Sequence, residues 1–354
     1  MPLPWMRTRP ARNEEPLHEF MLPQALPRHE ETRDAPLPGK IVPSRLFFQL
    51  DGRRRTVRYF DGDWRSADAD RHRFTGDRAR RRNQALAMLR RVTSGTVLAD
   101  FEAARFPETD GFFGRPVNVF QYNRRTGNRT AALWRLPGAY VPGPHLGGTG
   151  GEEPRDTHRF RDKRPRVYWR GPYTGARWVT PFEFRCPDPG TDEATLVDAA
   201  RYHSRAAAVL MSAEDPERYD FRFADPRRSR GLDCPYTATL APREAFLANR
   251  YVLCPTGTDV APDLYWVIAT RSLAFKEDSA YEVVPDYFLR PWVHYVPVAR
   301  GLTDLDDKFE YCERHPDLCE RMLDAANAAY RRMRIPDLWR DAEDTVLERL
   351  GLQT

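Results

Sequence analysis

Residues 250–298 read RYVLCPTGTDVAPDLYWVIATRSLAFKEDSAYEVVPDYFLRPWVHYVPV, and three short apolar runs in this stretch decide the fold. The runs, Tyr251 to Cys254, Ser272 to Phe275 and His294 to Val298, have the length of β-strands. Residues 262–270 have a helical pattern and lie between the first two runs. Strands that alternate with helices are typical of α/β units with a parallel sheet. We therefore expect an α/β fold.

The loop after the first run, Pro255 to Asp259, is the first candidate ligand site. It joins the carboxyl end of a strand to the start of a helix, which is where open α/β sheets hold nucleotide-like ligands. Gly257 would open the loop beside Thr258, and Asp259 would hold a ligand hydroxyl or cap the following helix. A helix cap without any ligand is the alternative.

The composition predicts a two-domain protein without a membrane-spanning helix. A chain of 354 residues suits two domains of ordinary size, and a hydrophobic content of 41% excludes a wholly disordered chain. The sequence has no apolar run that approaches about 18 residues, and its start lacks the apolar core of a secretory signal. We expect a cytoplasmic protein, and we leave open its peripheral association with the inner face of the membrane.

The net charge of +5 comes from arginine, because the chain has only four lysines. The arginines are spread along the sequence, whereas a nucleic-acid-binding protein would concentrate them on one face and interleave them with aromatic residues. We therefore predict a solvated basic surface and no nucleic-acid partner. Attraction to an anionic substrate or membrane surface is the alternative.

The five cysteines form an odd set without a CxxC pair, so neither a zinc site nor a complete disulfide framework is expected. This pattern fits a reducing compartment. Cys254 ends an apolar run and is predicted to be a small buried side chain. Cys312 and Cys319 are seven residues apart on a predicted helix and are expected to be buried on one face.

Changes in composition divide the chain into four parts. The Pro-rich and Arg-rich start should be an extended arm, and a Gly-rich loop near residue 150 should separate the two domains. The expected parts are an N-terminal arm (1–40), an N-terminal α/β domain (41–150), a C-terminal α/β domain (151–335) and a C-terminal helix (336–354).

Apolar patterning predicts the remaining helices and strands. Residues 46–50 and 56–60 flank Asp51-Gly52, a strong signal for a β-hairpin. The other expected strands are 96–101, 117–122, 131–136, 166–169 and 219–223. The other expected helices are 77–92, 192–212, 243–249 and 337–350, and more than one helix is expected within residues 304–332.

A second candidate site follows the predicted strand at 166–169, where the sequence reads Tyr168-Trp169-Arg170-Gly171. Glycine after a strand lets the backbone approach a phosphate closely, and guanidinium groups bind phosphates in a bidentate manner. Arg170 and Arg177, with Gly171 and Thr174 between them, are the candidate residues. An ordinary turn with surface arginines is the favoured alternative on spacing alone.

Two further motifs have a structural explanation that we favour. His294 lies between Trp292 and Tyr295 in an apolar strand, where a neutral core imidazole is more common than a ligand. Asp61-Gly62-Asp63 has the spacing of a metal-binding pair in some sugar-transferring enzymes, but a turn explains it better in a chain with 51 acidic residues.

Taken in order, these motifs resemble glycosyltransferase family 90, which includes the Rumi-type protein O-glucosyltransferases, fungal capsule xylosyltransferases and bacterial lipopolysaccharide-modifying enzymes. The resemblance rests on YWRG with TGxR (Tyr168 to Arg177), on RYVLxxxGTDV (Arg250 to Val260), and on LRPWVHYVPV followed by Asp304-Leu305. It covers roughly Val97 to Arg332 and is strongest in the second half.

The resemblance implies a GT-B-like architecture, in which two Rossmann-like domains face a central cleft and the C-terminal domain holds a nucleotide-sugar donor. It also implies inversion at the anomeric carbon without a bound metal or a cofactor. The donor, expected to be a UDP-sugar, would place its pyrophosphate near Arg170, Gly171, Thr174 and Arg177. Its nucleoside would lie near Gly257, Thr258 and Asp259, and Glu282 is the acidic residue expected before the PWVHY strand.

The residues around the expected catalytic base depart from the pattern of the family. An inverting transferase needs a group that deprotonates the acceptor hydroxyl, and a carboxylate is the usual choice. The eukaryotic members carry it in an Asp-aromatic-Pro element, but here Arg105 precedes Phe106-Pro107. Counting from Asp100 places the acid near Asp110. We therefore expect Asp110 as the base, with Asp100 second.

These expectations describe a glycosyltransferase that acts on a glycan or lipid-linked glycan acceptor in bacterial cell-surface polysaccharide synthesis, either of lipopolysaccharide or of capsule. Arg105 leaves a second hypothesis open, in which the chain binds a nucleotide sugar or a glycan on the same fold without catalysis. A nucleic-acid-binding protein is the third hypothesis, and only the basic charge supports it.

Overall fold

The computed structural model describes residues 15–22, 47–51, 56–60, 91–94, 96–100, 119–126, 132–134, 154–174, 192–225, 231–239, 241–242, 244–257, 260–261 and 263–352. These residues belong to two compact units. The first, here called the parallel-sheet unit, includes Glu152–Ser279 and Phe288–Met333. The second, here called the mixed-sheet unit, is formed by Arg12–Gly151, Ala280–Tyr287 and Arg334–Thr354.

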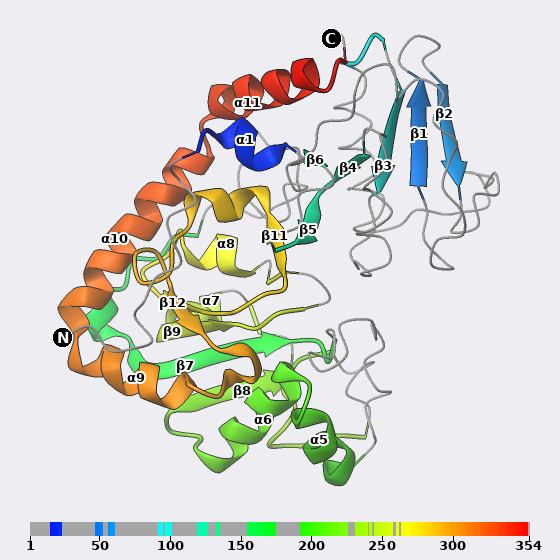
Figure 1. Ribbon diagram of the computed structural model, residues 1–354. Helices are drawn as coiled ribbons and strands as arrows, with labels where there is room; N and C mark the ends of the chain where they lie inside the picture. Colours follow the sequence, from blue (N-terminus) through cyan, green and yellow to red (C-terminus); the bar gives the residue numbers. More distant parts are fainter. Residues whose placement is uncertain are drawn as a thin grey trace. The chain divides into compact units, whose positions relative to one another are not determined.

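The parallel-sheet unit contains a sheet of five strands that run in the same direction (Figure 1). These are β7 (Arg164–Gly171), β8 (Tyr219–Phe223), β9 (Asn249–Cys254), β10 (Leu273–Glu277) and β12 (Val296–Val298). They lie in the order β12-β10-β9-β7-β8, and each neighbouring pair is parallel. The three apolar runs of residues 250–298 are the sites of β9, β10 and β12, so the predicted α/β fold with a parallel sheet is confirmed.

Helices cover both faces of this sheet. Successive side chains of a strand point to opposite faces, so one strand can contact helices on both sides. On one face Val167 and Trp169 of β7 belong to a buried cluster with side chains of four helices. These helices are α5 (Glu193–Ala200), α6 (Ser204–Glu214), α9 (Leu305–Arg314) and α10 (Pro316–Met333). On the other face the Tyr168 ring lies 4.8 Å from that of Phe246 in α7 (Glu244–Leu247). The Phe246 ring lies 6.1 Å from that of Trp266 in α8 (Asp263–Val267).

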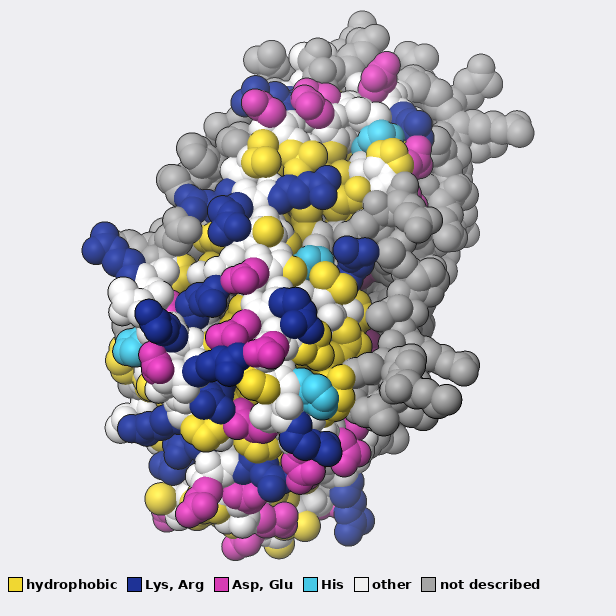
Figure 2. Space-filling view, turned by 90° about the vertical axis from the view of Figure 1, so that its left-hand side faces the viewer, with side chains coloured by type: hydrophobic (Ala, Val, Ile, Leu, Met, Phe, Trp, Pro, Cys, Tyr) yellow, Lys and Arg dark blue, Asp and Glu magenta, His cyan; other side chains and the backbone are white. Residues whose placement is uncertain are grey.

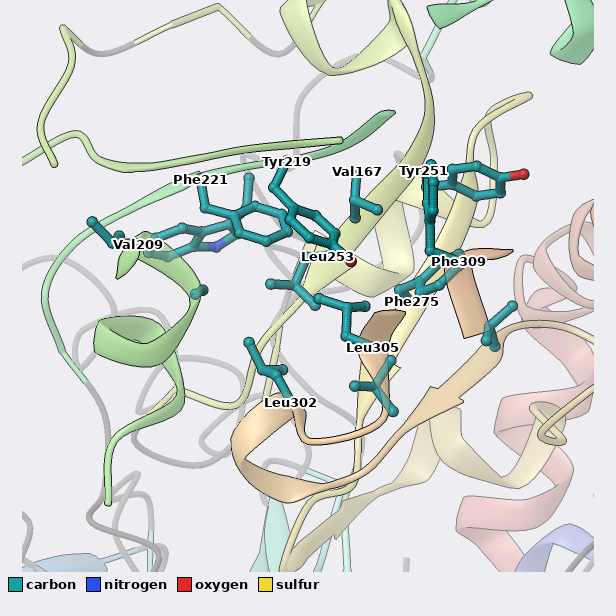
Figure 3. Packing of buried hydrophobic residues seen from close by; sticks show 14 of the residues in the cluster. Val167, Val209, Tyr219, Phe221, Tyr251, Leu253, Phe275, Leu302, Leu305 and Phe309 are labelled. Carbon is teal, nitrogen blue, oxygen red and sulfur yellow. The ribbon is translucent and has the colours of Figure 1, made fainter. Parts of the chain in front are cut away.

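Tyr251 lies in the packed core between the sheet and the helices α5, α6, α9 and α10 (Figure 3). Its ring makes edge contacts with Phe160, Phe275 and Phe309, at centroid distances of 5.7, 5.0 and 5.6 Å. Its hydroxyl donates a hydrogen bond of 2.5 Å to Oε1 of Glu313. A buried tyrosine needs such a partner for its polar end, so the ring can lie in the core without an unsatisfied hydroxyl.

The helix predicted over residues 192–212 is interrupted and forms two helices. α5 ends at Ala200 and α6 begins at Ser204, with His203 as its N-cap. The Nδ1 atom of His203 accepts a hydrogen bond of 3.4 Å from the backbone N–H of Ala206. The His203 ring is buried and lies 5.2 Å from the ring of Tyr173. This tertiary contact ends the helical pattern that the local sequence would allow.

The mixed-sheet unit contains a second five-stranded sheet of order β2-β1-β3-β4-β6. Its strands are β1 (Phe47–Asp51), β2 (Thr56–Phe60), β3 (Thr96–Asp100), β4 (Val119–Gln121) and β6 (Ala132–Leu133). β1 is antiparallel to β2 and to β3, whereas β3 and β4, and β4 and β6, are parallel. The predicted hairpin of β1 and β2 is confirmed. The predicted helix 77–92 lies outside the described residues except at its end.

A short two-stranded ribbon in the mixed-sheet unit joins β5 (Asn123–Arg125) to β11 (Tyr281–Val283), and it places Arg124 opposite Glu282. The Nε atom of Arg124 lies 2.6 Å from Oε1 of Glu282, and both side chains are almost fully buried. The two Nη atoms of Arg124 donate to the carbonyl oxygens of Leu22 and Phe20, at 3.2 and 2.5 Å. This ion pair therefore ties three distant parts of the chain together.

Two helices of this unit lie near the ends of the chain. α1 (Leu17–Met21) falls within the segment predicted as an extended arm, and its spacing of apolar residues buries Leu17, Phe20 and Met21. α11 (Pro336–Arg349) matches the predicted C-terminal helix closely and packs against α1. Arg349 of α11 forms an ion pair with Glu19 of α1. Part of the arm is thus helical and buried.

Predictions about four single side chains are confirmed. Cys254, Cys312 and Cys319 are buried thiols. His294 is buried too, and its Nδ1 atom accepts a hydrogen bond of 2.7 Å from the backbone N–H of Arg290. Burial, together with the positive charge of Arg290, lowers the pKa of His294 to about 4. The imidazole is therefore a neutral core group at neutral pH.

The exposed arginines of the parallel-sheet unit lie among carboxylates, and Figure 2 shows the two signs of charge interspersed on one face of the molecule. Arg161 contacts Asp317 and Glu320 of α10, and Arg271 contacts Asp324 of the same helix at 2.8 Å. Interspersed charges of this kind are typical of a solvated helical surface. Among the described residues, no helix is both long enough and apolar enough to span a membrane.

The buried contact between Arg124 and Glu282 leads to a prediction about stability. Replacing Arg124 with alanine removes the cation beside a buried carboxylate and the donor to two carbonyl oxygens. We expect the free energy of unfolding to fall by about 3–5 kcal/mol, as measured by urea denaturation. Arg161→Ala, which removes an exposed ion pair, is the control and should leave the midpoint nearly unchanged. An Arg124→Ala variant as stable as the wild type would contradict the prediction.

Candidate functional site

The order of the strands places a candidate ligand site at the carboxyl ends of β7 and β9. From β7 the chain passes outward to the edge strand β8, and then returns to the other side of β7 as β9. The strand order therefore reverses between β7 and β9. Ligands of open α/β sheets bind outside the carboxyl ends of the strands at such a switch point. The two candidate loops of the sequence, after Gly171 and after Cys254, begin at these two strand ends.

The loop after β7 is held close to the sheet by its aromatic neighbours. The indole of Trp169 lies against Gly171, where a Cβ atom would come within 2.6 Å of the ring. Glycine is therefore required at this position for steric reasons. Two residues further on, the buried ring of Tyr173 lies 4.6 Å from that of Phe223, the last residue of β8. These contacts fix the backbone that leads to Thr174.

Arg205, in the first turn of α6, connects the two candidate loops. Its Nη1 atom donates to the carbonyl oxygen of Pro172 at 3.0 Å and to Oγ1 of Thr174 at 2.8 Å. Its guanidinium carbon lies 5.5 Å from the centre of the Trp169 ring, within the range of a cation–π contact. The acceptors in these two hydrogen bonds are neutral oxygens, and Arg205 is buried. A fixed guanidinium group thus lies at the switch point.

The loop after β9 approaches the same guanidinium group. A Cβ atom at Gly257 would lie 3.0 Å from Nη2 of Arg205 and 3.3 Å from the carbonyl oxygen of Val260. The absence of a side chain at Gly257 therefore leaves room for Arg205. The predicted site residues Gly171, Thr174 and Gly257 are brought together here. Thr258, Asp259 and Arg177 lie outside the described residues.

Arg170 points to the opposite face of the sheet, where its guanidinium group contacts a carboxylate. Its Nη2 atom lies 2.7 Å from Oδ1 of Asp220, and its guanidinium carbon lies 4.4 Å from the centre of the Tyr168 ring. Arg166 also contacts Asp220, and Nε of Arg222 lies 3.3 Å from Oδ1 of Asp220. Burial would raise the pKa of Asp220, but Arg170 and Arg166 together hold it below its usual value. Arg170 is therefore engaged in an ion-pair network, and its role as a phosphate ligand stays a prediction.

The remaining candidates belong to the mixed-sheet unit. Glu282 forms the buried pair with Arg124, so a ligand role would require it to act from within that pair. Asp100 is the last residue of β3. Asp110 and the Asp61-Gly62-Asp63 tripeptide lie outside the described residues. Within the described part of the chain, no group of three or more His, Cys, Asp or Glu side chains is arranged to hold a metal ion.

The sequence analysis missed Arg205 because it predicted residues 192–212 as one continuous helix. An arginine in the middle of a helix gives no sign of a ligand site. The local signal for a helix start here is weak, because the capping residue is His203 and only Ser204 is of a type that commonly bonds to the backbone at helix starts. A helix start placed there puts Arg205 at the end of the helix nearest the sheet edge.

Comparison with known proteins finds a family model that matches part of the chain, including the Arg205 and Gly257 side of this site but not the loop after β7. Residues 198–334 match the family model described as glycosyl transferase family 90. This match begins in α5 and includes Arg205 and Gly257, and it confirms the resemblance predicted from the motifs.

Among curated proteins, the chain is similar to "O-glucosyltransferase LpsA" of Dichelobacter nodosus, with 26% identity over 183 residues. The aligned region covers 51% of this chain and 48% of that protein. "Protein O-glucosyltransferase 3" of Rattus norvegicus is 26% identical over 155 residues, which are 42% of this chain and 28% of that protein. "Protein O-glucosyltransferase 2" of Danio rerio is 32% identical over 77 residues, which are 22% of this chain and 15% of that protein. The chain thus spans half or less of the length of these relatives.

The position of Arg205 predicts that the switch point binds a small polyanion. We expect inorganic pyrophosphate to bind the wild-type protein, and Arg205→Ala to raise its Kd by about tenfold or more, since charge-assisted hydrogen bonds are lost. Isothermal titration calorimetry at low salt measures both. Arg218→Ala, which removes an arginine that contacts Asp306 on the surface, is the control. Loss of binding in Arg170→Ala, with no change in Arg205→Ala, would instead place the anion beside Arg170.

Proposed function

We propose, on the premise that residues 198–334 belong to glycosyltransferase family 90, that the protein is an inverting glycosyltransferase. It would move a sugar from a nucleotide donor, a UDP-sugar, to a glycan acceptor without a bound metal ion. The observation that carries the proposal is the overlap of the family match with the switch point of the parallel sheet, where Arg205 lies between two glycine loops. The similarity to "O-glucosyltransferase LpsA" and "Protein O-glucosyltransferase 3" supports the same reaction class.

The donor diphosphate would lie beside Arg205, Thr174 and the backbone after Gly171. The guanidinium group would bind the phosphate oxygens and offset the negative charge that grows on the diphosphate as it leaves. The nucleoside would extend along the loop after β9, where Gly257 leaves space beside the arginine. Arg170, Arg177, Thr258 and Asp259 remain candidate contacts of the same donor.

In the proposed reaction, the acceptor hydroxyl oxygen attacks the anomeric carbon from the side opposite the diphosphate. The bond between the anomeric carbon and the diphosphate oxygen breaks, and its electron pair stays on that oxygen. The hydroxyl proton passes to a carboxylate, for which Asp110 is the first candidate and Asp100 the second. One displacement of this kind inverts the anomeric configuration.

We also propose that the parallel-sheet unit and the mixed-sheet unit are the donor and acceptor halves of a GT-B-like enzyme. The base is then expected from Asp110, in the sequence that follows β3, or from Asp100 at the carboxyl end of β3. The acceptor would be a glycan or lipid-linked glycan of a bacterial cell surface, either lipopolysaccharide or capsule, and the enzyme would work on the cytoplasmic side of the membrane. The match with a protein of Dichelobacter nodosus supports a bacterial setting.

A second candidate function keeps the donor site without catalysis. It is favoured by Arg105, which stands where the family resemblance leads us to expect a carboxylate. Such a protein would bind a nucleotide sugar or a glycan and leave every acceptor unchanged.

The first test is a donor panel. We expect the protein to hydrolyse or transfer from at least one UDP-sugar, and we expect the rate to be unchanged in EDTA because no metal takes part. The nucleoside diphosphate that each nucleotide sugar releases is measured with and without EDTA. The anomeric configuration of the sugar product is assigned by NMR. Complete loss of activity in EDTA would refute the metal-independent mechanism, and retention of configuration would refute inversion.

The second test addresses the base. Asp110→Asn should lower kcat by about two to four orders of magnitude, the usual contribution of a general base, and should leave UDP binding unchanged. Asp100→Asn is examined in parallel, and the larger loss identifies the base. Asp324→Asn, which removes an exposed partner of Arg271, is the control and should keep full activity. If wild-type protein binds UDP-sugars but neither transfers nor hydrolyses them, the non-catalytic function is favoured.

A further inference from the structure

Glu277 is a fully buried carboxylate at the carboxyl end of the sheet, and the proposed reaction does not use it. It is the last residue of β10, the strand that follows β9 in the sheet order. Its side chain is only 1% exposed. Along β10 it alternates with Lys276 and shares the face of Phe275, which belongs to the core cluster beneath α6 and α9. The carboxylate is therefore on the same side of the sheet as Arg205.

The partners of Glu277 come from three different segments. Its Oε1 atom accepts hydrogen bonds from the hydroxyl of Ser204 and, at 3.1 Å, from the backbone N–H of Gly301. Its Oε2 atom accepts from the backbone N–H of Thr256 at 2.7 Å, and the Thr256 side chain is also a hydrogen-bond partner. Ser204 starts α6, Thr256 lies in the loop after β9, and Gly301 lies in the turn after β12. One carboxylate thus joins three segments by hydrogen bonds at the carboxyl end of the parallel sheet.

These donors explain why a charged group can lie here. Burial raises the pKa of Glu277 because a dry environment disfavours the carboxylate, and the hydrogen bonds act in the opposite direction. Within the described part of the chain, Glu277 accepts hydrogen bonds from hydroxyl and backbone N–H groups and takes part in no ion pair. Its hydrogen-bonding capacity is largely filled by the protein itself, so Glu277 is suited to hold loops in place and not to bind a ligand directly.

Two of the three segments that Glu277 holds lead directly to the candidate donor site. Ser204 precedes Arg205, whose guanidinium group contacts Pro172 and Thr174. Thr256 precedes Gly257, where a Cβ atom would lie 3.0 Å from Nη2 of Arg205. The separation between Arg205 and the loop after β9 therefore depends on two hydrogen bonds to the same carboxylate. Gly301 has φ of 77°, a conformation that favours glycine, and this lets its N–H group join the cluster.

We propose that Glu277 is a positioning residue for the donor site, and that its carboxylate holds α6 and the loop after β9 at the spacing that binds a nucleoside diphosphate. The proposal rests on the proposed function. It differs from a general role in stability because it ties Glu277 to one measurable property, the affinity for the diphosphate, through Arg205 and Gly257. Glu277 itself does not touch the donor or the acceptor.

The experiment compares two variants of Glu277 with a matched control. Glu277→Ala removes every acceptor, whereas Glu277→Gln keeps the shape and one oxygen but leaves one backbone N–H facing an amide NH₂ group. We expect Glu277→Ala to raise the Kd for UDP and the KM for the donor by about tenfold or more, and Glu277→Gln to raise them by a smaller factor. At saturating donor, kcat should stay within about twofold of wild type, because the reacting groups are unchanged.

Glu313→Gln is the control for stability alone. Glu313 accepts hydrogen bonds from Tyr251 and Arg250 in the same unit, so its loss should lower the unfolding temperature without changing the Kd for UDP. Equal UDP affinity in wild type and both Glu277 variants, all folded by circular dichroism, would overturn the proposal. A fall in kcat with unchanged KM would overturn it as well. Wild-type protein that binds no nucleoside diphosphate would refute the proposed function itself, which is a separate result.

Discussion

The reversal of strand order beside β7 is the constraint on which the candidate site depends. It makes β7 and β9 neighbours and brings the loops that follow them to one edge of the sheet. Two glycines then allow close approach at that edge, Gly171 to the indole of Trp169 and Gly257 to the guanidinium group of Arg205. A different strand order would separate these groups even if every strand and helix were kept. The candidate site therefore requires this strand order as well as its individual residues.

Much of the fold could be predicted from the sequence, because its signals are local. Buried parallel strands appear as continuous apolar runs, and β9 and β10 were found in this way. The hairpin of β1 and β2 follows from a short turn signal. The ribbon of β5 and β11 could not be found, since each strand has only three residues and its partner is far away in the sequence.

The candidate site was harder to predict because it depends on tertiary contacts. Thr174 and Gly257 were recognised from the turn chemistry around them. Arg205 was not, because a buried histidine outside the helical pattern sets the start of α6. Arg170 was recognised as an arginine after a strand, but only the pairing of β7 with β8 shows that Asp220 lies beside it. A motif gives the residue types at a site, whereas the register of the strands decides which of them meet.

The structure stabilises its buried charges in two ways, and the difference matters for function. Arg124 and Glu282 lie in contact, and removing either one is expected to cost several kcal/mol. Glu277 is stabilised by hydroxyl and backbone N–H groups, each hydrogen bond to a charged group contributing about 1.5–3 kcal/mol. An ion pair joins two segments, whereas a carboxylate with several donors can join three. The second arrangement suits an edge where loops from different strands must keep a fixed spacing.

The position of Arg205 relative to the two phosphates decides whether it contributes to donor binding or to the rate of the proposed reaction. A unit charge at about 4 Å from another contributes about 4 kcal/mol at the effective dielectric constant of a protein surface. The diphosphate of a nucleotide sugar is already negative before the reaction, and one further charge develops on the oxygen that leaves the anomeric carbon. If Arg205 lies beside the phosphate nearer the nucleoside, it stabilises the bound donor and the transition state equally and acts mainly on KM. If it lies beside the phosphate that carries the sugar, it stabilises the new charge more and acts on kcat. The contacts of Arg205 with Thr174 and Pro172 fix the guanidinium group relative to the sheet, so one of these two effects should predominate.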